Sequence, residues 1–339
     1  MADEKTVLHI GPVNARGGIS NFIRLMSENA LENWRVKTLS TFVEGSKFAK
    51  YRRWRNARKE LTEILHNSRP DIVHVHSASD YSWWRKKRVV KICRKAGIPV
   101  VIHFHSGKFD DFCASGKGVE VLKICSMPGV QPVVLSEGWA KRLNEWLPDA
   151  TVICVPVEEQ PKHDVKRENR QLLFMGRNDP IKGAAIAVEA ARNCGIEVSL
   201  FMTGIEGTES WIKEDVKSGL VKPLGWVQEE TKSKLMQQST LIMVPSEFEG
   251  QPAVVLEAMA NGLPVIGSSA VAETLGDAGL ILQSLDPQVW SESLTELLNS
   301  EDLEQMSKAG TERVKQHSIG KILHQWDSLY SDVIHETNS

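Results

Sequence analysis

The chain has 339 residues, of which 41% are hydrophobic and 25% are charged, and its formal net charge is -2. This length predicts two domains, and the ordinary globular composition, without low-complexity segments or repeats, excludes disordered, fibrous and solenoid proteins. The start, MADEKTVLHI, lacks the features of a signal peptide, and no apolar run reaches the roughly 18–20 residues that span a bilayer. The cysteines are scattered without a CxxC pair, which favours a reduced, cytosolic compartment.

Short apolar runs alternate with helical patterns in the first part of the chain. Strands are expected at TVLHI, DIVHVH, PVVIHFHS and VVLS, and helices from about Ser20 and over Glu137–Leu147. Alternation of this kind predicts a parallel sheet with helices on both faces. The run TVICVPV is followed by the polar stretch EEQPKHDVKRENR, which predicts a linker near residues 156–170.

The alternation restarts after this linker. Strands are expected at QLLFMGR, VSLFMTG, TLIMVPS, LPVIGS and GLIL, and helices over Gly183–Asn193, Glu229–Gln238 and Ala253–Ala260. We therefore expect an α/β protein with two Rossmann-like, doubly wound parallel-sheet domains, formed by residues 1–157 and 158–318 and facing a central cleft. Ligands of such sheets bind beyond the carboxyl ends of the strands, so residues at those ends are the candidates for a site.

Positive charge is concentrated near the N-terminus, where residues 1–110 contain 21 lysine and arginine residues against 10 aspartate and glutamate residues. Most of it lies in two clusters that contain tryptophan, Lys50–Lys59 and Trp83–Lys95. A solvated helix face is the plain interpretation of either cluster. Two together favour contact with an anionic membrane surface, because tryptophan prefers the membrane interface. The pI of 6.6 and the lack of an RNA-binding or zinc-finger signature argue against nucleic acid.

Two glycines, Gly17 and Gly18, separate the first expected strand from its helix. Glycine at such a position lets the backbone approach a phosphate beside the first helix amides, although a plain tight turn is the alternative. The stretch is not a GxGxxG motif, and no acidic residue stands at the offset that binds ribose. A nicotinamide cofactor is therefore disfavoured.

Four histidines alternate with other residues in two of the expected strands. We expect His103 and His105 to point to opposite faces of the sheet, and likewise His74 and His76, so that neither pair could bind a metal ion. In this interpretation His74 and His103 are core residues with satisfied hydrogen bonds. His105 precedes the polar loop SGKFDDF and is expected to face the cleft.

Arg177 and Lys182 lie on either side of a turn at the carboxyl end of QLLFMGR. An arginine and a lysine with this spacing can converge on one diphosphate, since arginine offers a forked donor and lysine a point charge. The alternative is two unrelated surface cations. Asp110 and Asp111 form an adjacent carboxylate pair, which we interpret as loop polarity or plain solvation rather than a magnesium site.

The stretch SEFEGQPAVVLEAMANGLPVIGS places two glutamates eight residues apart. It predicts a strand end, a turn and a helix whose first amides, near Ala253 and Val254, can bind a phosphate. Glu249, followed by Gly250 in the turn, could accept hydrogen bonds from the group attached to that phosphate. Glu257, further along the helix, could bind the hydroxyls of a ribose. A diphosphate between a sugar and a nucleoside is a nucleotide-sugar.

These segments resemble a known family. EGQPAVVLEAMANGLPVIGS is similar to the E-x7-E signature of the retaining, two-domain GT-B glycosyltransferases of family 4, and FMGRNDPIKG is similar to their FVGRLDPEKG segment. The resemblance extends to the GG loop, to PDIVHVH and PVVIHFH, and to a final helix at about residues 319–336, which in this family packs back on the N-terminal domain.

The resemblance implies a role for each candidate residue. Arg177 and Lys182 would bind the donor diphosphate, Glu249 the transferred sugar and Glu257 the ribose. In the same comparison Gly18 would approach the distal phosphate and His105 the reacting sugar, and the backbone at Gly225 and Val227 would lie near the base.

Two departures from the family pattern leave the donor open. Pro252 stands where glycine is common and removes one amide, and GSSAVAET lacks the paired glycines that often follow the motif, although Glu273 is kept.

The favoured function is transfer of a sugar, with retained configuration, from a nucleotide-diphosphate-sugar to a hydroxyl of a lipid-linked glycan or a cell-surface polysaccharide precursor. We expect no metal or other cofactor, because two cations and a helix terminus can neutralise the diphosphate. The expected location is cytoplasmic, peripheral on the inner face of the membrane. The alternatives are a nucleotide-sugar epimerase or phosphorylase with a similar fold, and a non-catalytic subunit that binds a nucleotide-sugar.

Overall fold

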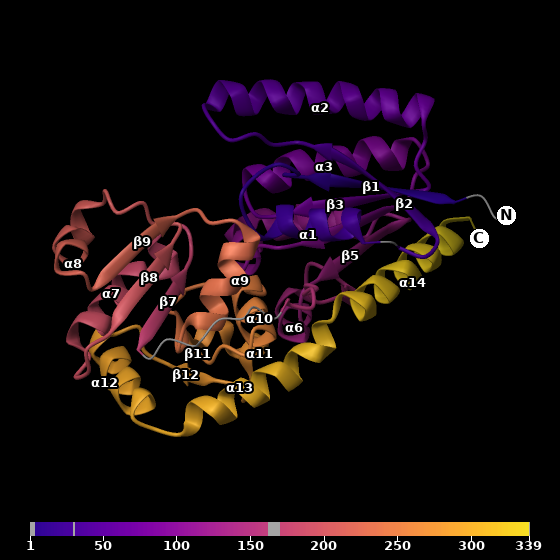
Figure 1. Ribbon diagram of the computed structural model, residues 1–339. Coiled ribbons are helices and arrows are strands. Elements are labelled where there is room, and N and C mark those ends of the chain that lie inside the picture. Colours follow the sequence, from indigo (N-terminus) through magenta and orange to yellow (C-terminus); the bar gives the residue numbers. More distant parts are fainter. Residues whose placement is uncertain (1–3, 30, 162–169, 339) are drawn as a thin grey trace. The chain divides into compact units, whose positions relative to one another are not determined.

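A computed structural model describes residues 4–29, 31–161 and 170–338 of the chain. The chain divides into two compact units, Met1–Pro156 with Ile319–Ser339 and Val157–Ser318 (Figure 1). Each unit holds a six-stranded sheet whose neighbouring strands are parallel and are joined by helices. The predicted α/β class with two doubly wound parallel sheets is therefore confirmed.

The sheet of the first unit has the strand order β2-β1-β3-β4-β5-β6. Its strands are β1 (Lys5–Gly11), β2 (Trp34–Ser40), β3 (Ile72–Ser77), β4 (Val100–Phe104), β5 (Val130–Val134) and β6 (Thr151–Val152). Its longer helices are α1 (Gly18–Glu28), α2 (Lys47–Asn67), α3 (Tyr81–Lys95), α5 (Gly118–Cys125), α6 (Glu137–Leu143) and α14 (Ile319–Asn338). The helix α14 belongs to this unit although it is the last element of the chain.

Successive side chains of a strand point to opposite faces, so each face of this sheet has its own core. On one face, Leu8 and Val73 pack with residues of α2 and α3, such as Trp54 and Trp83. On the other face, Val7 packs with residues of α1 and α14. The second core holds Phe22 of α1 together with Ile322, Trp326 and Tyr330, which follow one another at intervals of four residues and form one apolar stripe on α14.

The sheet of the second unit has the order β12-β11-β10-β7-β8-β9. Its strands are β7 (Gln171–Met175), β8 (Ser199–Thr203), β9 (Val221–Gly225), β10 (Leu241–Val244), β11 (Val265–Ser268) and β12 (Leu280–Leu282). Its longer helices are α7 (Ala184–Asn193), α8 (Lys213–Ser218), α9 (Glu229–Gln238), α10 (Ala253–Ala260), α12 (Pro287–Leu298) and α13 (Asp302–Arg313). Because β7 and β10 pair in parallel, with Leu172 opposite Leu241, their carboxyl ends lie side by side.

Two strands were not expected from the sequence, and both lie at the edge of a sheet. They are β2 in the first unit and β9 in the second. The expected linker falls largely on residues 162–169, outside the described residues. All five cysteines are free thiols. Among the described helices, none combines the length and the apolar character needed to cross a bilayer.

Candidate functional site

The loops after β7 and β10 bring two of the predicted site residues together. Lys182 Nζ donates a hydrogen bond to Glu249 Oε1 at 2.7 Å, and Ser246 Oγ donates to the same oxygen at 2.8 Å. The Glu249 side chain is only 11% exposed and that of Lys182 24%. A partly buried carboxylate held by a cation and a hydroxyl has a fixed orientation, which suits a group that positions a ligand.

A glycine allows the loop after β7 to approach β10 this closely. Gly183 has φ 70°, and a Cβ added there would lie 2.1 Å from the carbonyl oxygen of Pro245. The Glu247 amide donates to the carbonyl oxygen of Ile181 at 2.8 Å, which ties the two loops directly. The position of Lys182 is therefore fixed by the backbone as well as by its ion pair.

Arg177 lies on the same loop but takes a different partner. Its guanidinium Nη2 is 3.8 Å from Asp179 Oδ2, and its side chain is 62% exposed. Asp179 also accepts a hydrogen bond from the Ile181 amide at 3.3 Å and so caps the short turn at Pro180–Lys182. The described contacts thus join Lys182 to Glu249, and Arg177 to Asp179.

Glycines also allow the ends of the neighbouring strands β8 and β9 to lie close to the end of β7. Gly204, after β8, has φ 76°, and a Cβ there would lie 2.2 Å from the carbonyl oxygen of Gly176. Gly225, which was expected near the base of a nucleotide, has φ 58° and donates its amide to Ile205 at 2.9 Å. Val227, two residues further, is half-buried. The ends of β7, β8 and β9 are thus packed closely, backbone against backbone.

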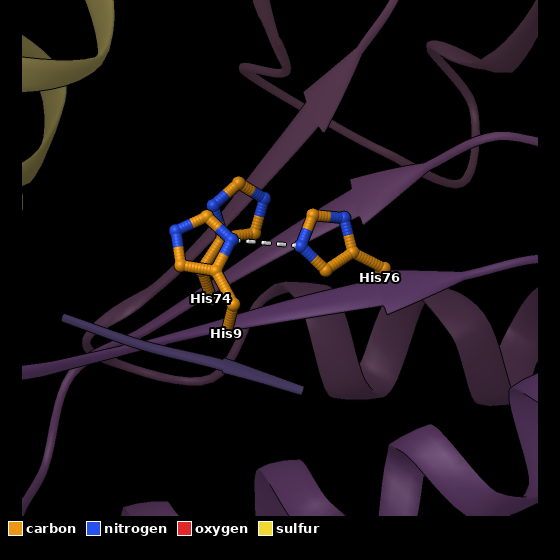
Figure 2. Close-up of side chains that lie close together, drawn as sticks. All are labelled: His9, His74 and His76. Carbon is orange, nitrogen blue, oxygen red and sulfur yellow. Dashed lines mark hydrogen bonds between the residues drawn. The ribbon is translucent and has the colours of Figure 1, made fainter. Parts of the chain in front are cut away.

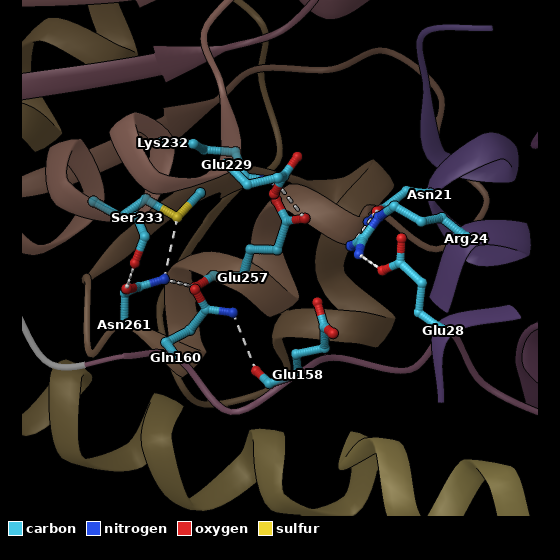
Figure 3. A network of polar contacts seen from close by, with 11 residues as sticks. Asn21, Arg24, Glu28, Glu158, Gln160, Glu229, Lys232, Ser233, Glu257 and Asn261 are labelled. Carbon is cyan, nitrogen blue, oxygen red and sulfur yellow. Dashed lines mark hydrogen bonds and ion pairs between the residues drawn. The ribbon is translucent and has the colours of Figure 1, made fainter. Parts of the chain in front are cut away.

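The second glutamate of the motif is held by a lysine that sequence reasoning missed. Lys232 Nζ on α9 donates to Glu257 Oε1 on α10 at 2.8 Å and lies 2.6 Å from Glu229 Oε2 (Figure 3). Burial disfavours the charged lysine, but the attraction of Glu257 and Glu229 outweighs this effect and raises the pKa of Lys232. Glu257 is therefore held beside a permanently charged ammonium group.

Further hydrogen bonds link α9 to α10 next to the pair of Lys232 and Glu257. Asn261 Nδ2 donates to the Glu257 carbonyl oxygen at 2.8 Å, while its Oδ1 accepts from Ser233 Oγ at 3.0 Å and Gln237 Nε2 at 2.9 Å. Lys232 and its neighbours reach Glu257 only through tertiary packing, so no spacing in the sequence pointed to them.

The helix α10 begins directly after the turn that carries Glu249 and the half-buried Gly250. Pro252 is its N-cap, and no side-chain hydrogen bond caps the helix. The amides of Val255 and Leu256 both point to the Pro252 carbonyl oxygen, at 3.0 Å and 3.4 Å.

The amides of the first helical residues have no partner inside an α-helix. In α10 these belong to Ala253 and Val254, the predicted phosphate contacts, and both residues are half-buried. This helix terminus can therefore bind an anion.

In the first unit, Gly17 and Gly18 begin α1 as predicted. Gly17 is the N-cap with φ 135°, a conformation that side chains rarely adopt, and no side chain caps the helix. A Cβ at Gly17 or Gly18 would meet no atom within 4 Å in the described structure. Crowding by neighbouring atoms therefore does not explain the glycine at position 18, and its role in approaching a ligand stays a prediction.

The expectation that paired histidines point to opposite faces was wrong. His74 and His76 have ring centroids 4.2 Å apart, and those of His103 and His105 are 4.0 Å apart. Residues two apart in a strand share a face, so both pairs lie on the side of the sheet covered by α1 and α14. His9 of β1 joins them, and we call these five residues the histidine cluster (Figure 2).

The hydrogen bonds of the histidine cluster form a chain. His76 Nδ1 lies 3.1 Å from His105 Nε2, and His76 Nε2 lies 3.0 Å from His9 Nδ1. His74 Nδ1 lies 2.6 Å from the hydroxyl of Tyr330.

The expected satisfied core histidines are only partly found. His74 Nε2 and both ring nitrogens of His103 are buried without a hydrogen-bond partner. His105 is half-buried just after β4, where burial and the nearby Lys86 charge lower its pKa to about 3. It is therefore a neutral imidazole at pH 7, able to donate or accept a hydrogen bond.

The second basic cluster is less exposed than the sequence analysis assumed. Trp83, Lys86 and Lys87 are buried on α3. Lys87 Nζ pairs with Glu120 Oε1 at 2.6 Å, and Lys86 donates to the hydroxyl of Thr41. Trp83, Lys86, Lys87 and Val90 follow the helical spacing i, i+3, i+4, i+7, which is the signal that could have placed both lysines on the buried face.

Both units match known glycosyltransferase families. Residues 27–157 match the family described as Glycosyltransferase Family 4, and residues 169–300 match the family described as Glycosyl transferases group 1. Each unit therefore resembles a glycosyltransferase domain. The structure also resembles that of HepE from Anabaena in complex with UDP-glucose, with a TM-score of 0.74, 16% identity and coverage of 96% of this chain and 99% of the other. The predicted GT-B fold is thereby confirmed.

Two named relatives are similar in sequence to part of this chain. The D-inositol 3-phosphate glycosyltransferase of Corynebacterium efficiens is 27% identical over 177 residues, which are 47% of this chain and 42% of that protein. The O-antigen chain mannosyltransferase B of Escherichia coli is 26% identical over 187 residues, which are 52% of this chain and 48% of that protein. The matched part of the chain thus spans about half the length of these relatives.

Proposed function

We propose that this glycosyltransferase moves a sugar from a nucleotide-diphosphate-sugar to a hydroxyl of a lipid-linked glycan or a cell-surface polysaccharide precursor. The observation that carries the proposal is the 2.7 Å pair of Lys182 and Glu249 beside the start of α10. A cation, an oriented carboxylate and free helix amides are the groups needed to bind a diphosphate with a sugar attached. The binding of UDP-glucose by HepE and the name of the Escherichia coli relative support this donor class and this acceptor class.

The donor diphosphate is assigned to the cations and amides at the ends of β7 and β10. The ammonium group of Lys182 has three donors, so it can keep its bond to Glu249 while it contacts a phosphate oxygen. Arg177, which is largely exposed and lies 3.8 Å from Asp179, can turn toward the second phosphate. With the amides of Ala253 and Val254, these groups neutralise the diphosphate, so the proposed transfer uses no metal ion.

The two glutamates are assigned to the two ends of the donor. Glu249 binds the hydroxyls of the transferred sugar, and Glu257 binds those of the ribose. Each carboxylate already has its own lysine, Lys182 or Lys232, which orients it. Ionised carboxylates accept two hydrogen bonds from neighbouring hydroxyls well. Separate ion pairs fit two binding roles better than the facing acid and nucleophile of a retaining glycosidase.

The chemical step is proposed to occur on one face of the sugar. The bond between the anomeric carbon and the phosphate oxygen breaks, and the acceptor oxygen forms its bond on the same face, so the configuration is retained. The acceptor proton passes to the departing diphosphate. Arg177, Lys182 and the α10 amides stabilise the negative charge that develops there, and neutral His105 donates a hydrogen bond to the sugar.

The acceptor is proposed to be reached at an anionic membrane surface. On α2, Phe48 and Tyr51 are 72% and 64% exposed, and the basic residues Arg52, Arg55 and Arg58 are exposed beside them. Exposed aromatic and basic side chains on one helix favour contact with lipid headgroups. Because two lysines of α3 are buried, the proposed membrane contact is assigned to α2.

Thermal unfolding with UDP, GDP, ADP and their sugar conjugates tests the donor assignment, since a ligand of the native state raises the midpoint. We expect one diphosphate to raise the midpoint and Arg177→Ala to weaken that effect. Release of the same diphosphate on addition of a glycan acceptor, with retained anomeric configuration by NMR, then tests the transfer. Binding without turnover against lipid-linked acceptors would favour a non-catalytic subunit.

A further inference from the structure

The histidine cluster has more ring nitrogens than hydrogen-bond partners. Both nitrogens of His103 and Nε2 of His74 are buried without a partner in the described structure. Nearly all buried polar atoms in folded proteins are paired, and unpaired ones in a group call for a bound water or ion. His103, with two unpaired nitrogens, lies near the carboxyl end of β4 and is the register partner of His76 on β3.

Three members of the cluster have the geometry of a metal site. His76, His103 and His105 each offer one ring nitrogen, and these three atoms lie within 4.8 Å of one another. His76 Nδ1 and His105 Nε2 are 3.1 Å apart. Two nitrogens bound to one ion at about 2.0–2.1 Å in a tetrahedral site are separated by about 3.3 Å. Small side-chain rotations would bring all three nitrogens onto one ion.

The hydrogen bonds of the second ring nitrogen of His76 also fit a metal site. Histidine ligands usually hold their second nitrogen in a hydrogen bond, which fixes the tautomer and the ring orientation. His76 Nε2 lies 3.0 Å from His9 Nδ1 (Figure 2). His9 Nε2 in turn lies 3.4 Å from the Tyr330 hydroxyl.

A second possible triad, His9, His74 and His76, is less suitable. All three residues are fully buried, so none of them is reached from solvent. His105, by contrast, is half-buried beyond the end of β4.

We propose that His76, His103 and His105 bind one divalent transition-metal ion, such as Zn²⁺, Co²⁺ or Ni²⁺, with water at the fourth position. An all-imidazole ligand set selects these ions over Mg²⁺ and Ca²⁺, which prefer oxygen. The ion takes no part in the proposed transfer. Because it would hold the His105 ring, which the proposed function assigns to the sugar, its binding would inhibit turnover, a consequence that rests on that function.

Metal binding is measured without reference to activity. The untagged, EDTA-treated full chain is titrated with ZnCl₂ by calorimetry, and its Co²⁺ complex is followed by visible absorption. We expect one equivalent to bind and Zn²⁺ at 100-fold excess over Kd to raise the unfolding midpoint by roughly 5–10 °C, whereas Mg²⁺ has no effect.

Two variants distinguish the triad from surface histidines. His105→Ala, at a half-buried position, is expected to keep its far-UV circular dichroism and to bind Zn²⁺ at least about 10-fold more weakly, as loss of a ligand predicts. His324→Ala, at an exposed position of α14, is expected to bind like the wild type. If His105→Ala unfolds, His105→Gln replaces it. An unchanged affinity in the His105 variant, or no Zn²⁺ binding by the wild type, overturns the proposal.

Discussion

Lys182 Nζ and Glu249 Oε1 are 2.7 Å apart although the two residues are separated by 67 positions in the sequence. The pairing of β7 with β10 explains this contact, because it places the two strand ends side by side. The same pairing joins the segment FMGRNDPIKG to the segment EGQPAVVLEAMA. The two sequence motifs are therefore one site.

Glu249→Ala is expected to lower kcat by about 100-fold or more, because the sugar loses an oriented acceptor and Lys182 loses its partner. Stability should change little, since the pair is partly exposed to water. Diphosphate release under saturating donor measures kcat. Glu247→Ala, two residues earlier and exposed, is the matched control and should keep full activity. A Glu249→Ala enzyme with wild-type kcat would exclude the assigned role.

Lys232→Met should weaken donor binding by removing the cation that orients Glu257. It should also destabilise the second unit by about 1–3 kcal/mol at pH 7, because a partly buried carboxylate loses its partner. KM for the donor and urea unfolding measure the two effects. Lys234→Met, whose lysine pairs with Glu230 on the exposed side of α9, is the control.

The stability difference between wild type and Lys232→Met should depend on pH. The folded-state pKa of Lys232 lies above its ordinary value of 10.5, so the folded state keeps this proton more tightly than the unfolded state. The stabilisation is therefore complete below the unfolded pKa and is lost as pH rises through the folded pKa. Urea unfolding of both proteins between neutral and strongly alkaline pH should show the gap closing. A gap that widens with pH would contradict the pairing.

The fold could largely be predicted because buried parallel strands are recognisable as continuous apolar runs. The two missed strands, β2 and β9, are edge strands with mostly exposed or half-buried residues, so they lack such runs. Pro223 in β9 also argues against a strand, although an edge strand tolerates proline.

The sequence predicted the residues of the candidate site that follow the ends of strands, such as Lys182 and Glu249. Lys232 could not be found, since it reaches Glu257 through the packing of α9 on α10. The histidine cluster could have been predicted from the sequence, because residues two apart in a strand, such as His74 and His76, lie on the same face of the sheet. Its partners on α14, such as Tyr330, depend on the return of the last helix to the first unit.

Two glycine substitutions should distinguish effects on the stability of the fold from effects on donor binding. Gly183→Ala should destabilise the protein by more than about 1 kcal/mol, because φ is 70° and the new Cβ would meet the Pro245 carbonyl oxygen. Gly18→Ala should leave stability unchanged, since nothing lies within 4 Å of its Cβ, but should weaken donor binding. Urea unfolding and the nucleotide-dependent midpoint shift measure the two properties. Equal donor binding by Gly18→Ala and wild type would remove Gly18 from the site.

The exposed aromatic side chains of α2 give a specific test of membrane contact. Replacing Phe48 and Tyr51 by serine should reduce binding to anionic vesicles by about 10-fold or more, because it removes apolar surface that would enter the headgroup region. Both side chains are exposed, so folding should be unaffected. Cosedimentation with phosphatidylserine vesicles at low and high salt measures the effect. Val119→Ser, at an exposed apolar position of α5, is the control. Binding that is weak, insensitive to salt and equal in all three proteins would mean that the acceptor is reached without the membrane surface.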